Sequence, residues 1–292
     1  MSGEAYVLAT DSCCDLPESL AEEFGLVVLE FPFTIDGERH FDDLGRSMSA
    51  ATFYEKMRAG AQPTTAQVPL SEYLAAFTQA AEDGVPLVFL SFSSGLSGTY
   101  DAALVARDTV LAAHSGARIR VIDTLCASAH QGLLVLEAAR RRADGASFEE
   151  LGEWAEASRR RLNGYFTTDS LESLRRGGRV SDLAVLAGTM LDVKPILRVN
   201  GDGELVVDRP VRGRKKSLRA IADTFAARAG CVQGTVVIAH GDAPDDALTL
   251  EALLRERAEI ADVLVFEVGP VIGSHTGPGM VAAVFWGPER DS

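Results

Sequence analysis

The sequence predicts an α/β protein of two domains. At 292 residues the chain is too long for one comfortable hydrophobic core. In the first half, apolar strand-like runs alternate with helical patterns, as where Leu87–Phe92 is followed by Tyr100–Ala113. In the second half, Asn200-Gly-Asp-Gly203 is a hairpin signal. We therefore expect a Rossmann-like three-layer α/β/α domain with a mostly parallel sheet over residues 1–163, and a mixed α/β domain over 164–292.

The first domain is expected to contain strands and helices in alternation, with a hairpin turn at Asp36-Gly37. Its expected strands cover 6–10, 26–35, 38–41, 87–92 and 119–123, its helices cover 49–58, 71–81, 100–113, 129–142 and 148–162, a further helix opens at 15–17, and 60–69 is a loop.

The second domain is expected to mix hairpins with strand–helix–strand units. Its expected strands cover 165–168, 193–199, 204–210, 235–239, 263–268 and 281–286, its helices cover 171–176, 182–190, 218–229 and 245–260, and 273–279 is a flexible loop.

Composition and charge exclude several classes of protein. The net charge of −14 disfavours binding to nucleic acid, because the field of the whole protein repels a polyanion. The four cysteines form no C-x-x-C pair, which argues against a metal site and against a secreted disulfide framework. No apolar stretch is long enough to span a bilayer, and the N-terminus lacks the basic region of a signal peptide. We expect a cytoplasmic protein that is not embedded in a membrane.

The segment Ser93–Thr99 joins a buried-type strand to a helix and carries four hydroxyls and two glycines. Unpaired amides and the helix dipole make such a turn suitable for an anion. Ser94, Ser97 and Gly98 are therefore candidate ligand-binding residues. The ordinary alternative is a capped turn whose serines satisfy only their own backbone.

Three other segments are candidates for the same site. Asp11 and Ser12 follow the first strand, at the edge where doubly wound sheets bind ligands, although either residue could simply cap a helix. Thr65 lies in a polar loop bounded by prolines, and His275 lies between two hydroxyl residues in a glycine-rich segment. A histidine in that setting can donate to an anion or orient another donor. These segments could converge only between the two domains.

Arginines concentrate in two places, 175–179 and 209–219, in an otherwise acidic chain. Surface charge is the ordinary explanation, but such clusters also suit a phosphate or an acidic partner. The nucleotide-binding fingerprints G-x-x-x-x-G-K-[ST] and strand-linked G-x-G-x-x-G are missing, and Ser97 lacks the second glycine of a G-x-S-x-G elbow.

Taken in order, these motifs resemble the DegV family, the bacterial fatty-acid-binding proteins that present a fatty acid to a fatty acid kinase. The matching segments are Thr10-Asp-Ser12, Thr65-Ala-Gln67, Ser93-Ser-Gly-Leu-Ser-Gly-Thr-Tyr100, Val121-Ile-Asp123, Leu174-Arg-Arg-Gly-Gly-Arg179, Lys194-Pro195 and Ile272-Gly-Ser-His-Thr-Gly-Pro-Gly279. The resemblance covers essentially the whole chain. Two departures are Cys13-Cys14, where the family has a small polar residue, and Ala66, where it commonly has serine.

The resemblance implies a carrier of long-chain fatty acid that has no cofactor and is not itself an enzyme. The tail would be buried and the carboxylate held at the domain junction by Thr65 and Ser97, with His275 beside them. Arg179 and Arg212 would lie near the mouth, where a separate kinase binds transiently and makes acyl-phosphate for phospholipid synthesis. Transient contact with a membrane is compatible with this role.

Physical reasoning agrees with lipid binding, because burying a saturated tail yields about 0.8 kcal/mol per CH₂, on the order of 10 kcal/mol gross for palmitate. Two rival functions stay open at this point. One is a serine hydrolase or acyltransferase that uses Ser97, His275 and an aspartate such as Asp11. The other is a phosphate- or nucleotide-binding enzyme that uses the glycine turns and the arginines.

Overall fold

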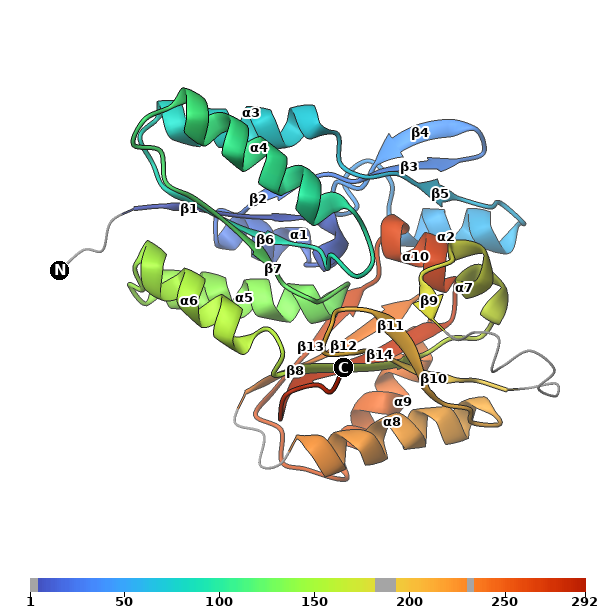
Figure 1. Cartoon of the computed structure of the whole chain (residues 1–292). Helices are drawn as coiled ribbons and strands as arrows, with labels where there is room; N and C mark the ends of the chain where they lie inside the picture. Colours follow the sequence, from blue (N-terminus) through green and yellow to red (C-terminus); the bar gives the residue numbers. More distant parts are fainter. Residues whose placement is uncertain (1–4, 182–192, 230–233) are drawn as a thin grey trace.

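The computed structural model describes residues 5–181, 193–229 and 234–292. The helix expected over 182–190 and the cysteine at position 231 lie outside the described residues. Within them, two sheets lie one above the other with helices between them and on both outer faces (Figure 1). The two-domain α/β class expected from the sequence is confirmed.

The smaller of these two sheets is parallel throughout, as expected for a Rossmann-like unit. Its strands, in spatial order, are β2 (Val27–Leu29), β1 (Val7–Asp11), β6 (Leu87–Ser91) and β7 (Ile119–Asp123). Helices α3 (Leu70–Glu82) and α4 (Thr99–Ala113) cover its outer face, while α1 (Glu18–Glu23), α5 (Ala129–Ala143) and α6 (Phe148–Ser158) lie on the opposite face (Figure 1). A 3-10 turn, η1 (Ser12–Cys14), follows β1 directly.

The larger sheet is mixed, as expected for the second half of the chain. Its strands, in spatial order, are β13 (Asp262–Glu267), β12 (Thr235–Gly241), β14 (Met280–Trp286), β8 (Leu162–Thr167), β10 (Ile196–Val199), β11 (Leu205–Arg209) and β9 (Val180–Ser181). Helices α8 (Arg214–Arg228) and α9 (Pro244–Arg255) cover the outer face, and α5 packs on the inner face against β8, β12 and β14. Two short helices, α7 (Leu171–Gly177) and α10 (Pro270–Thr276), pack against each other beside the sheet.

A third, small sheet corrects two expectations. The single strand expected over 26–35 is two strands, β2 and β3 (Pro32–Ile35), because the Phe31 amide donates to Ser12 Oγ at 3.1 Å and the chain leaves the parallel sheet there. β3 pairs with β4 (Glu38–Phe41) through the expected Asp36-Gly37 turn, whose two residues both have positive φ. β3 also pairs with β5 (Thr64–Thr65), so the expected loop over 60–69 contains a short strand. Helix α2 (Ala50–Arg58) packs beside this sheet.

The first part of the glycine-rich segment near the C-terminus, 273–276, belongs to helix α10, which corrects the loop expected over 273–279 for those residues, whereas 277–279 lie outside the helix. Pro270 starts α10 at its first turn, and Gly277, at φ +76°, ends it. Gly273 serves packing, because a Cβ there would lie 2.6 Å from the Tyr54 hydroxyl. The sequence shows that the segment is rich in glycine, but it does not show that Gly273 packs against Tyr54.

The second half of the chain begins with β8. The helix expected to reach residue 162 ends at Ser158, and Leu162 already belongs to the larger sheet. The boundary expected between residues 163 and 164 thus falls inside β8, and we propose that it lies just before Leu162.

A continuous hydrophobic core joins the two halves. It contains side chains from both facing sheets and from α5, whereas a second core fills the space between the larger sheet and helices α8 and α9. Hydrogen bonds reinforce the junction: Ser93 Oγ donates to the Gly203 carbonyl at 2.7 Å, and the buried Arg290 guanidinium donates to the carbonyls of Leu125 and Asn200. Among the described residues, the junction is therefore largely a packed interior, and it encloses one cavity of about 630 Å³.

Candidate functional site

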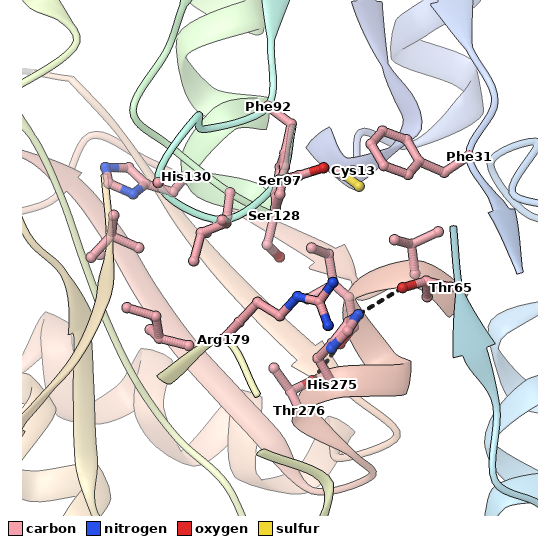
Figure 2. A pocket seen from close by; sticks show the side chains of 18 of the residues that line it. Cys13, Phe31, Thr65, Phe92, Ser97, Ser128, His130, Arg179, His275 and Thr276 are labelled. Atoms are coloured by element: carbon pink, nitrogen blue, oxygen red, sulfur yellow. Dashed lines mark hydrogen bonds between the residues drawn. The ribbon is translucent and has the colours of Figure 1, made fainter. Parts of the chain in front are cut away.

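A cavity of about 630 Å³ lies at the junction between the two halves. Its interior walls are mostly apolar and buried, and come from both halves of the chain. The buried apolar residues are Cys13, Phe31, Phe92, Ala129, Phe166, Val199, Leu205, Val271, Ile272, Met280, Ala282 and Val284, and the half-buried Ala127 lies among them. Exposed or half-buried polar residues line one end, as Figure 2 shows for Thr65, Ser97, His275 and Arg179. The site is a deep apolar pocket with a polar mouth.

Ser97 and Gly98 line this mouth at the start of α4, where the sequence places an anion site. Ser97 Oγ lies 2.8 Å from Thr99 Oγ1 and accepts a 3.3 Å hydrogen bond from the Thr99 amide. A Cβ on Gly98 would lie only 2.6 Å from Gln67 Nε2, so glycine lets the threonine loop approach the start of α4. The mouth is thus closely assembled from two segments that are far apart in the sequence.

Ser94 also lines the cavity, but Asp123 holds its hydroxyl. Ser94 Oγ donates to Asp123 Oδ2 at 2.5 Å, and the Ser94 amide donates to Oδ1 of the same carboxylate. We infer that Ser94 shapes the loop and that Ser97 carries the more available hydroxyl.

Thr65 and His275 form a hydrogen-bonded pair at the mouth, with 2.9 Å between Thr65 Oγ1 and His275 Nε2 (Figure 2). Pairing with β3 positions Thr65, and α10 positions His275. Burial, with a smaller effect from the nearby Arg179 charge, lowers the pKa of His275 to about 4. The imidazole is therefore neutral at pH 7, and its buried Nδ1 has no partner among the described residues.

Asp11 and Ser12 do not line the cavity, in contrast to the direct role expected from the sequence. Asp11 Oδ2 accepts a hydrogen bond from the Phe92 amide at 2.8 Å, and burial raises the pKa of its carboxyl to about 7. Ser12 binds the Phe31 amide, as described above. Both side chains hold loops that carry cavity residues, so their contribution is indirect.

The hydrogen bonds do not form a catalytic triad. His275 Nε2 bonds Thr65, Ser97 Oγ bonds Thr99, and no described carboxylate bonds His275 Nδ1. A serine nucleophile needs a base within hydrogen-bond reach and a third group to orient that base. Ser97 and His275 thus do not form the hydrogen-bonded arrangement of a serine hydrolase.

The two candidate arginines occupy different positions. Arg179 is exposed, lines the mouth and points toward His275 in Figure 2, while its Nη1 donates to the Gly177 carbonyl at 2.7 Å. Arg212 is also exposed and forms an isolated β-bridge with Val193, but it is not among the residues that line the cavity. Of these two arginines, Arg179 is the one that lines the cavity.

The sequence interpretation missed the network around Ser128, which lines the cavity wall. Ser128 Oγ donates to Asp15 Oδ2 at 2.5 Å, and the Gly269 amide at the start of α10 donates to Asp15 Oδ1 at 2.9 Å. Burial raises the pKa of Asp15 to about 7. The pattern Asp15-Leu-Pro17 suggested only a helix cap, and no local signal shows that this carboxyl reaches a residue 254 positions away.

Three further observations concern the cysteines, the metal-ligating side chains and the helices of the described residues. The cysteines at 13, 14 and 126 are free thiols. Over 5–181, 193–229 and 234–292 we find no cluster of three or more metal-ligating side chains. No helix in those ranges is long and apolar enough to cross a bilayer.

Comparisons with known proteins agree with this architecture. The family model described as "Uncharacterised protein, DegV family" matches residues 6–287. A DegV domain-containing protein of Clostridium perfringens is 39% identical over 287 residues, which is 98% of this chain and 99% of that protein. A structure on fatty acid binding of a DegV family protein from Thermus thermophilus is 30% identical, with a TM-score of 0.86 over 97% of this chain and 99% of that one. A stearic acid-binding protein from Eubacterium ventriosum is 26% identical, with a TM-score of 0.85 over 97% and 98% of the two chains. The chain described here therefore belongs to the DegV family.

Proposed function

We propose that this protein binds one long-chain fatty acid, with the tail in the junction cavity and the carboxylate at its polar mouth. The observation that carries the proposal is the cavity itself, a 630 Å³ space with buried apolar walls and hydroxyls gathered at one end. Burial of the tail provides most of the affinity, at about 0.8 kcal/mol per CH₂ before entropic losses. Relatives with the same fold bind fatty acids, among them the proteins of T. thermophilus and E. ventriosum.

The mouth suits a carboxylate held by neutral donors. If His275 Nε2–H donates to Thr65 Oγ1, the threonine hydroxyl is left to donate its own hydrogen to the ligand. Ser97 supplies a second hydroxyl at the start of α4. Hydrogen bonds from neutral groups to a charged acceptor each contribute about 1.5–3 kcal/mol. Such donors orient the head group and leave its oxygens accessible.

We further propose that the protein is a cytoplasmic carrier and not an enzyme, and that it presents the bound acid to a separate kinase. Two observations support this proposal. Ser97 and His275 bond other residues and not each other, and Arg179 places an exposed positive charge at the mouth of the cavity. An exposed arginine suits the phosphate of an acyl-phosphate or an acidic surface of the partner. Arg212 is exposed and does not line the cavity, so we propose that it contacts the partner.

The test is uptake of radiolabelled palmitate by delipidated protein, with a variant that fills the cavity. Ala282 lines the cavity from β14, so Ala282→Phe should abolish uptake, whereas Ala112→Phe on the exposed face of α4 should not change it. Thermal melting of both variants checks that they fold. Failure of the wild-type protein to take up the acid, or equal uptake by Ala282→Phe, would contradict the proposal.

A further inference from the structure

The cavity has a closed end, opposite the polar mouth. In Figure 2 His130 lies at the side of the pocket away from Thr65 and His275. His130, Gly164 and Val284 all line the cavity and are all buried. Gly164 and Val284 are register partners on β8 and β14, where their side-chain positions face α5. Met280, four residues before Val284 on the same face of β14, lies at the start of that strand, four residues after the end of α10, the helix that carries His275.

The imidazole of His130 is fixed at this closed end. Its Nε2 lies 2.9 Å from the Leu162 carbonyl, which can only accept, so Nε2 carries the hydrogen. The side chain is 3% exposed, and burial together with the charge of Arg290 holds its pKa well below the usual range. Gly164 lies against the ring: a Cβ there would lie 3.4 Å from His130 Cγ and Nδ1, which is an ordinary van der Waals contact. The imidazole is therefore a neutral ring in contact with β8 through Leu162 and Gly164.

Beyond His130 the same face of the sheet is filled. The next inward positions are Leu162 on β8 and Trp286 on β14, which are register partners and do not line the cavity. Leu162 is fully buried, and the Trp286 ring lies 6.2 Å from that of Trp154 on α6. Apolar packing continues past the histidine, so removing the imidazole would extend the cavity along apolar side chains.

We propose that His130, seated on Gly164, ends the acyl tunnel and sets the length of the fatty acid that this protein prefers. The inference rests on the proposed function and assigns the residue that determines specificity at the far end of the ligand. The carboxylate is held at the mouth, so the methyl end of an optimal acid stops at the imidazole. Each methylene beyond that point must displace a hydrogen-bonded ring.

The experiment measures displacement of a fluorescent fatty acid by saturated acids from lauric to arachidic acid. In His130→Ala the preferred acid should become longer, with the relative affinity for longer acids rising about fourfold per additional methylene accommodated. Gly164→Ala should shift the preference toward shorter acids, because its methyl occupies the tunnel end at an ordinary contact distance from the imidazole. His130→Gln, which can still donate to the Leu162 carbonyl, should keep the wild-type profile.

His240→Ala is the matched control, because His240 is also a buried histidine but does not line the cavity. It should leave the length profile unchanged. Identical profiles for the wild type, His130→Ala and Gly164→Ala would overturn the assignment, and if His130→Ala does not fold, an unchanged profile in Gly164→Ala alone would do so. Absence of binding by any acid to the wild type would instead refute the proposed function.

Discussion

The buried carboxyl of Asp15 should make the protein less stable as the pH rises toward neutrality. In the folded protein burial raises the pKa of Asp15 to about 7, against about 3.9 in an unfolded chain. Below pH 4 the group is protonated in both states and has no effect. Between pH 4 and 7 only the unfolded state releases the proton, which favours unfolding. Three pKa units at about 1.4 kcal/mol each amount to a loss of about 4 kcal/mol.

Asp15→Asn should remove this loss and keep the structure. The amide oxygen can still accept from the Gly269 amide, and the amide nitrogen can donate to Ser128 Oγ. We expect the free energy of unfolding of the variant to fall less between about pH 4.5 and about pH 7.5, and the variant to be the more stable protein at the upper end. Burial also raises the pKa of Asp11 to about 7, so some dependence should persist.

The assay is urea unfolding followed by tryptophan fluorescence at a series of pH values, with Asp101→Asn on the exposed face of α4 as the control. The control should follow the wild-type pH dependence. A parallel pH dependence in Asp15→Asn and the wild type would refute the reasoning, because it would mean that the carboxyl is ionised in the folded state at little cost.

Three further predictions concern the mouth of the cavity. Thr65→Ala and Ser97→Ala should each weaken fatty acid binding by about 1.5–3 kcal/mol in calorimetric titrations, and unchanged affinity in both would show that the head group lies elsewhere. Arg212→Ala and, less cleanly, Arg179→Ala should keep the affinity for fatty acid while slowing phosphorylation of the bound acid by the kinase that we propose as partner; a parallel loss of both would place the arginines in the head-group site. The pKa of His275 is lowered to about 4 in the folded protein, against about 6.5 in an unfolded chain. The stability that the neutral imidazole contributes is therefore complete above about pH 6.5 and is lost as the pH falls toward 4. In urea unfolding, His275→Gln should therefore lose less stability in acid than the wild type does.

Much of the fold could be predicted from local patterns. The parallel strands at Val7–Asp11, Leu87–Ser91 and Ile119–Asp123 follow buried apolar runs of the expected length, and Asp36-Gly37 marks its hairpin. The break after β2 could not be predicted, because it depends on Ser12 binding the Phe31 amide across 19 residues. Helix α10 was not predicted because its glycines suggest a loop. One of these glycines, Gly273, is instead needed for close packing against α2.

The candidate site divides in the same way. Ser97 and His275 stand out locally, as hydroxyls at a helix start and as a histidine among hydroxyls, and the structure brings both to the cavity mouth. Asp11 stands out for a similar reason, but its carboxylate accepts the Phe92 amide and does not line the cavity. The sequence could not predict this, because the position of an aspartate at the end of a strand does not show which way its side chain points. Ser128 was missed because its φ of +58° and its contact with Asp15 arise only from the tertiary fold. A sequence pattern identifies such side chains but not their partners.

The central claim is that the junction cavity holds one fatty acid. The most direct measurement is mass spectrometry of lipid extracted from the purified, denatured protein, with the amount of lipid compared with the amount of protein. The account predicts a long-chain fatty acid at about one molecule per chain, and its loss in Ala282→Phe. Purified protein that carries no fatty acid, and that takes up none when it is supplied, would contradict the account.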